Sequence, residues 1–304
     1  SMLQRMNELA VQAANGTNSK DDREAIQAEI KQLTTEIDRV AETTKFNETY
    51  LLKGAADGGT KTITLNVHDA GIKGTMGEKA NDGSYTFTID NFQTGGTVTI
   101  AGKTFKIVDS NPKGDGSEMT MGDAKDFAIK AFEDANKIGG ANPTVVQGDA
   151  DNQFKITPGT VEVAKALQFN LHVGADADLT NKIGVEIETM SSRYLGIEGI
   201  DVVGSDEEVG GTTATYAIDA IADAVAKVSA QRSALGAIQN RLEHTIANLD
   251  NIVENTTAAE SRIRDTDMAE AMVEYSKNNI LQQAGQSMLA QANQATQGVM
   301  SLLQ

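Results

Sequence analysis

The residues that could carry metal or acid–base chemistry are few and widely spaced. The three histidines, His68, His172 and His244, lie far apart, and none belongs to an H-E-x-x-H helix, the commonest zinc-hydrolase pattern. No glycine-rich nucleotide loop opens a helix after a strand, and no G-x-S-x-G serine elbow is present. Acidic turns at residues 149–152 and 176–178 resemble fragments of calcium loops but lack the terminal Glu. We therefore expect no enzyme, no cofactor and no metal site.

Composition argues against further classes of function. The 304 residues include 43 acidic and 26 basic side chains, a net charge of −17, which disfavours both nucleic-acid binding and docking on an anionic membrane. Zero Cys excludes disulfides, thiolate zinc sites and cysteine nucleophiles. No apolar run reaches the ~18 residues of a membrane-spanning helix.

The two ends of the chain are predicted to be long helices. Proline, which breaks helix interiors, occurs only in the middle, at Pro112, Pro143 and Pro158. At the N-terminal end, apolar residues recur at steps of three and four, and Ser19 is a candidate cap for a second helix. Near the C-terminus a 4-3 apolar seam continues for several heptads, which is typical of a coiled-coil-like helix. The seam residues are Ile218, Ile221, Val225, Val228, Leu235, Leu242, Ile246, Leu249 and Val253.

The middle of the chain changes to Gly, Asp, Thr and Lys, with short alternating runs. Residues 85–89 and 97–100 alternate with period two around Gly95-Gly96, which predicts a hairpin, and residues 103–107 and 153–156 predict further strands. Residues 123–137 predict an amphipathic helix. Segments 166–173 and 183–189 predict another hairpin, and a Gly-rich acidic loop is expected at residues 203–213. The expected fold is a mainly α rod of long antiparallel, coiled-coil-like helices with a β-hairpin, plus an inserted small α+β domain.

The last segment carries no charge between Asn278 and Gln304, and glutamines surround an apolar stripe. Such a helix can bury itself among identical copies without stranding ions, whereas a free tail normally carries charge. An ordinary terminal helix packed on its own domain is the alternative. The pattern favours self-association.

Several strings resemble one known family, bacterial flagellin, over about half of the chain. They lie at residues 4–18 (QRMNELAVQAANGTN), 28–47, 235–242 (LGAIQNRL), 260–267 (ESRIRDTD), 279–294 and 299–304 (VMSLLQ). The resemblance implies a structural subunit of the bacterial flagellar filament, secreted through type III export and polymerised outside the cell for motility. It implies a discontinuous rod domain (residues 1–54 and 164–264), an inserted variable outer domain (55–163) and a C-terminal inner-tube helix (265–304).

The resemblance also implies interaction residues. Arg5, Leu9 and Glu29 match positions through which flagellins bind Toll-like receptor 5, although Asn7 stands where many receptor-active members carry a second Arg. A second set matches the tail that self-assembles, binds an export chaperone and is recognised by cytosolic NAIP-type receptors. This set comprises Leu281, Met288, Leu289, Val299, Leu302 and Leu303.

One departure concerns the N-terminus. Flagellins usually carry a long inner-tube helix before the segment that resembles residues 4–18, so we expect this chain to lack that helix and to polymerise poorly alone. Two alternative functions stay open: a hook–filament junction protein, which shares related termini, and an adhesin that acts through the inserted domain. A metallopeptidase in the insert is disfavoured, because residues 55–163 hold one His and no H-E-x-x-H.

Overall fold

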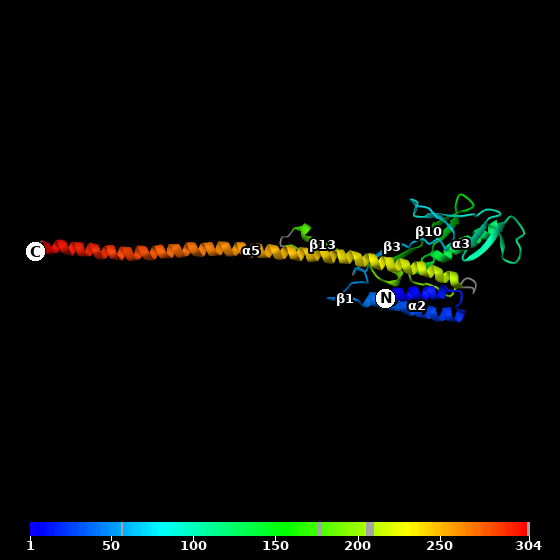
Figure 1. Ribbon diagram of the computed structural model, residues 1–304, viewed down its shortest axis with the longest axis horizontal. Coiled ribbons are helices and arrows are strands. Elements are labelled where there is room, and N and C mark those ends of the chain that lie inside the picture. Colours follow the sequence, from blue (N-terminus) through cyan, green and yellow to red (C-terminus); the bar gives the residue numbers. More distant parts are fainter. Residues whose placement is uncertain (56, 175–177, 205–209, 303–304) are drawn as a thin grey trace. The chain divides into compact units, whose positions relative to one another are not determined.

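The structure, a computed structural model, describes residues 1–55, 57–174, 178–204 and 210–302 (Figure 1). About half of the chain is helical, with one long C-terminal helix and several small sheets. The chain divides into two compact units, which are described separately. Unit 1 comprises Ser1–His172 and Lys182–Ile238, and unit 2 comprises Val173–Asn181 and Gln239–Gln304.

Unit 1 begins with the helices α1 (Met2–Ala14) and α2 (Lys20–Thr43). The predicted cap is confirmed: the Ser19 hydroxyl accepts from the Asp22 amide at 3.2 Å, and the Asp22 carboxylate accepts from the Ser19 amide at 3.1 Å. This reciprocal pair satisfies amides at the helix start that have no partner within the helix. Local sequence thus fixes where α2 begins.

The strands that the structure describes in unit 1 form five small sheets, and all the described pairs are antiparallel except for β7–β8. Two-stranded sheets pair β1 (Lys45–Phe46) with β2 (Thr49–Tyr50), β3 (Thr60–Thr64) with β11 (Thr160–Ala164), and β12 (Leu167–His172) with β13 (Lys182–Ile187). A four-stranded sheet has the order β4 (Gly74–Met76), β5 (Tyr85–Ile89), β10 (Gln153–Thr157), β9 (Thr144–Gln147). A three-stranded sheet has the order β6 (Thr97–Ile100), β7 (Lys103–Val108), β8 (Glu118–Thr120).

The helix α3 (Met121–Asn136) packs with these two larger sheets around one apolar core. Strand alternation turns Phe87, Phe105 and Phe154 inward, where all three are fully buried. The Phe87 and Phe132 rings meet edge to face with centroids 5.1 Å apart. The expected helix near residues 123–137 is confirmed.

One predicted pairing is wrong. Strands β5 and β6 both form, but β5 pairs with β4 and β10, whereas β6 pairs with β7. The β6–β7 hairpin turns at Ala101-Gly102, both with positive φ, at 52° and 76°. Alternation indicates which face of a strand is buried but not which strand lies beside it, so the pattern around Gly95-Gly96 suggested the wrong partner. The hairpin of β12 and β13 is confirmed.

The remaining helices follow the β12–β13 hairpin. They are the short α4 (Ser192–Leu195) and the long α5 (Gly210–Leu302, 93 residues), with 3₁₀ turns at Ile138–Gly140 and Leu179–Asn181. The loop expected at 203–213 is partly wrong, because α5 already begins at Gly210; its residues 205–209 lie outside the described part of the chain. Within unit 1, α5 buries Ala217, Ile221 and Ala224 in a helical core with α1 and α2.

Candidate assembly and recognition surfaces

Within the described ranges, no cluster of three His, Cys, Asp or Glu is arranged to hold a metal ion. His68 is instead tied into the fold. Its backbone amide donates to the Asn136 side chain at 2.7 Å, and its carbonyl accepts from the same side chain at 3.0 Å. Its ring nitrogen Nε2 lies 3.5 Å from Asp223 Oδ2. Nor is any helix of the described chain both long and apolar enough to cross a membrane.

The structure brings Arg5 and Glu29 together on the surface of α1 and α2. Arg5 Nε donates to Glu29 Oε1 at 2.8 Å, and Nη1 lies 3.5 Å from Glu8 Oε2, the carboxylate one turn along α1. The hydrogen bond that Arg5 donates to Glu29, followed by the charge of Glu29, raises the pKa of Arg5 above its ordinary value. The two side chains stay 51% and 42% exposed, so both charges face solvent. They form a polar patch that a partner can contact.

Leu9 does not share this exposure. It is 2% exposed and lies in the core that α1 forms with α2 and α5, beside Met6 and Ala13. The family resemblance implies a receptor contact at Leu9, and in this structure the Leu9 side chain is packed inside unit 1. The physical reason is the helical period, which places Leu9 on the apolar face of α1 and Arg5 on the rim of that face.

Those predicted tail residues whose side chains the structure describes lie in unit 2 and are open to solvent along α5. Leu281, Met288, Leu289 and Val299 are exposed by 58%, 69%, 66% and 60%. The Leu302 side chain and the whole of Leu303 lie outside the described residues. A helix that presents large apolar side chains to water is stabilised when another surface covers them, because apolar area is removed from water.

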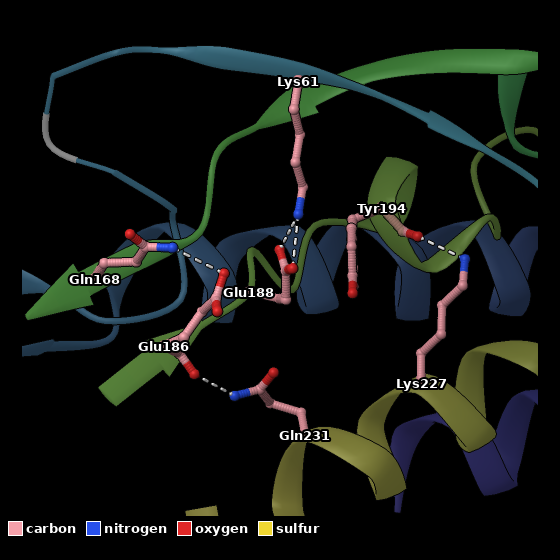
Figure 2. Close-up of polar contacts among 7 residues, drawn as sticks. All are labelled: Lys61, Gln168, Glu186, Glu188, Tyr194, Lys227 and Gln231. Atoms are coloured by element: carbon pink, nitrogen blue, oxygen red, sulfur yellow. Dashed lines mark hydrogen bonds and ion pairs between the residues drawn. The ribbon is translucent and has the colours of Figure 1, made fainter. Parts of the chain in front are cut away.

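Sequence reasoning missed a polar network in unit 1 that joins strands, α4 and α5 (Figure 2). Lys61 on β3 bonds both carboxylate oxygens of Glu188 at 2.6 Å. The Lys227 amine on α5 donates to the Tyr194 carbonyl at 2.8 Å, and the Gln231 amide donates to the Glu186 carbonyl at 2.9 Å. No sequence motif signals this network, because bonded members such as Lys61 and Glu188 lie 127 residues apart.

Two side chains of α2 hold the segment that leads to α5. Asp38 accepts from the Ser192 amide at 2.7 Å and from the Ser192 hydroxyl at 2.8 Å. Gln27 donates to the Ile200 carbonyl and accepts from the Val202 amide, both at 2.8 Å. The helical core of unit 1 thus includes this segment through specific polar bonds as well as apolar packing.

These features describe a largely helical protein that presents an exposed apolar helix face and an exposed ion pair. Residues 1–57 match the bacterial flagellin N-terminal helical region, and residues 218–303 match the bacterial flagellin C-terminal helical region. Flagellin from Clostridium tyrobutyricum is 41% identical over 98% of this chain and 78% of its own length. Flagellin B from Vibrio anguillarum is 32% identical over 99% of this chain and 77% of its own length.

Among solved structures, flagellar hook associated protein-3 from Legionella pneumophila covers 87% of this chain and 88% of its own, with a TM-score of 0.41 and 14% identity. The chain belongs to the bacterial flagellin family. It is a structural, non-enzymatic subunit of the extracellular flagellar filament, and it assembles with copies of itself.

Proposed function

We propose that residues 265–304 form the inner-tube helix through which this subunit assembles. Residues 1–54 and 164–264 would form the rod, and residues 55–163 an outer domain inserted into it. One observation carries the proposal: α5 presents Leu281, Met288 and Val299 to solvent in a stretch that has no charged side chain.

The spacing of these side chains supports a single docking face. Leu281 and Met288 are seven residues apart, and Met288 and Val299 eleven, so all three lie on one side of a helix. Burying one such side chain contributes about 1.5–3 kcal/mol. Because the surrounding polar residues are uncharged, covering this face desolvates no ion.

Met288→Asp tests this face, with Gln283→Asp as the matched control on the opposite side of the helix. Both variants are added to filament seeds, once as this chain stands and once with a family-derived helix placed before Ser1, and elongation is scored by electron microscopy. We expect the extended chain and its Gln283→Asp variant to elongate and Met288→Asp to stop elongation. Equal elongation by both variants would contradict the proposal.

We further propose that the Arg5–Glu29 patch is the part of the chain that Toll-like receptor 5 contacts. Its support is the exposed, paired geometry, since charge-assisted hydrogen bonds favour recognition at such sites. Arg5→Ala should lower receptor signalling in a reporter assay. Arg39→Ala, which removes a similarly exposed pair with Glu36 on α2, should not. Leu9 would act through packing, so Leu9→Ala should lower signalling only as far as it lowers the stability of unit 1.

The same exposed tail is the proposed site for an export chaperone and for NAIP-type receptors. An apolar helix face is the surface that a helix-binding groove recognises, and Leu289 and Val299 are open to such a groove. Hydrogen exchange with and without a flagellin export chaperone should show protection confined to residues 278–302. Protection elsewhere and none in the tail would argue against this site.

A further inference from the structure

We infer that residues 57–163 are locked onto the first turns of α5, so that this segment and residues 212–228 open and close as one cooperative unit. An outer segment that made no specific contacts with the helices would unfold independently of them. The structure instead places α5 side chains inside the segment and links the two parts by polar bonds at both ends of their contact.

The first link is Tyr216. It is 4% exposed and belongs to the apolar core that α3 and the larger sheets form, although it lies on α5. Its hydroxyl donates to the Ala70 carbonyl at 3.3 Å, and one turn earlier the Thr212 hydroxyl donates to the Ala101 carbonyl at 3.0 Å. Ala70 and Ala101 both have positive φ, 56° and 52°, which a non-glycine residue adopts at a cost. The α5 side chains therefore hold two strained turns in place.

The second link continues along the same side of α5. The Asp223 carboxylate accepts from the side-chain amide of Asn66 at 2.8 Å, and its Oδ2 lies 3.5 Å from Nε2 of the His68 ring. Thr212, Tyr216 and Asp223 follow each other at steps of four and seven, which keeps them on one face of the helix. The contact thus extends over several turns rather than resting on one residue.

The third link passes through Tyr194 on α4 (Figure 2). Lys61 from β3 and Lys227 from α5 both lie close to the Tyr194 ring, with Nζ 5.9 and 5.4 Å from its centroid. Burial lowers the pKa of the Lys227 amine and raises the pKa of the Tyr194 hydroxyl. Lys227 is held by the Tyr194 carbonyl, and Lys61 by Glu188. Tyr194 is therefore a relay between β3 and α5.

The other side of α5 explains why these links matter. Ala217, Ile221 and Ala224 pack in the helical core with α1 and α2, so this part of α5 has an apolar core on each side. A displacement of residues 57–163 must either break the three links or move α5. The first turns of α5 therefore carry the effect of a force on the outer segment, or of a ligand bound to it, to the helical core.

Phe87→Leu tests the coupling. Phe87 packs on Phe132 within the core of the outer segment, so the substitution weakens that segment while it keeps the hydrogen-bonding groups of the α5 links. Native-state hydrogen exchange by mass spectrometry on the whole chain reads both parts. We expect amides of β5 and β10 to exchange about tenfold faster, and amides of residues 214–228 to accelerate by a similar factor. Acceleration confined to the outer segment would overturn the inference.

Variants at the links give a second, independent readout. In a Phe87→Leu background, adding Tyr216→Phe and Thr212→Val should weaken the coupling of the two exchange rates, because the bonds to the Ala70 and Ala101 carbonyls are lost while the Asp223 and Tyr194 links remain. Thr215→Val is the matched control, since the Thr215 hydroxyl donates within α5, to the Gly211 carbonyl. Should the link variants leave the two rates as closely coupled as Thr215→Val does, these bonds do not carry the coupling and this inference is wrong.

Discussion

Two stretches of α5 have similar apolar patterns and opposite surroundings. In unit 1, Ala217 and Ile221 are 1% and 0% exposed, whereas in unit 2, Ile280 and Leu289 are both 66% exposed. Both stretches are helical and both carry an apolar stripe. The difference lies in whether this chain supplies the covering partner. For the first stretch it does, through α1, α2 and the outer segment, whereas the described residues of unit 2 do not cover the second.

The largest expected effect tests that difference directly. Ile221→Ala should lower the free energy of unfolding by about 2–5 kcal/mol, because it leaves a cavity among packed side chains. Ile280→Ala removes the same atoms from an exposed site and should change stability by less than about 0.5 kcal/mol. Urea unfolding of the two variants measures both. Similar losses would mean that the second stretch is packed in the isolated chain.

A smaller effect is expected where polar bonds, rather than apolar packing, hold unit 1 together. Asp38→Ala leaves the amide and hydroxyl of buried Ser192 without their acceptors and should cost about 1–3 kcal/mol. Asp38→Asn keeps an oxygen that can accept from the Ser192 amide, so it should cost clearly less. Thermal unfolding compares the two variants, and equal losses would show that the lost charge, and not the acceptor, is what matters.

The exposed stretch should respond instead to helix propensity. Gly285 lies within α5, and a Cβ built there meets no atom within 4 Å. Gly285→Ala should therefore stabilise the helix locally by about 1 kcal/mol, because alanine loses less backbone entropy on helix formation. Hydrogen exchange of residues 278–295 should slow, while the unfolding midpoint of unit 1 stays unchanged. A shift of that midpoint would indicate that the two units share one transition.

Local features of this fold were predictable from the sequence. The cap at Ser19, the alternation in β5 and β7 and the hairpin of β12 and β13 each depend on neighbouring residues. Contacts between distant residues were not. The partner of β5 is β10, far along the chain, and the apolar face that contains Leu9 is covered by α2 and α5. Hydrophobic periodicity marks a buried face without naming what buries it.

The candidate surfaces divide in the same way. The uncharged tail could be read directly from the sequence, because lack of charge is a property of composition. The family resemblance pointed to Arg5 and Glu29, but only the structure shows them bonded across α1 and α2. The contacts of Tyr194 could not be predicted from the sequence, because Lys61 and Lys227 approach its ring from distant parts of the chain. The prediction of an inserted outer domain gave no indication of its bonds to α5 for the same reason.

The smallest expected effect concerns an exposed ion pair of unit 1. It tests whether charged side chains contribute to the stability of this unit in addition to apolar packing. Asp82 lies 2.6 Å from the Lys155 amine and accepts from the Ser84 hydroxyl and amide. The hydrogen bond from Lys155, followed by those from Ser84, lowers the pKa of the Asp82 carboxyl below its ordinary 3.8. Its stabilising contribution is then fully present at neutral pH and is lost as the pH falls below that value.

Asp82→Asn should therefore leave stability at neutral pH almost unchanged, since exposed pairs contribute little. It should flatten the decline in stability between about pH 4 and pH 2, where the unfolded chain takes up a proton that the folded chain resists. Lys155→Met, which removes the partner with the largest effect on the pKa, should flatten the same range. Urea unfolding at a series of pH values measures the slope. If the stability of both variants declines as steeply with falling pH as that of the parent chain, this ion pair contributes nothing measurable to stability. The difference between unit 1 and the exposed helix would then be due to packing alone.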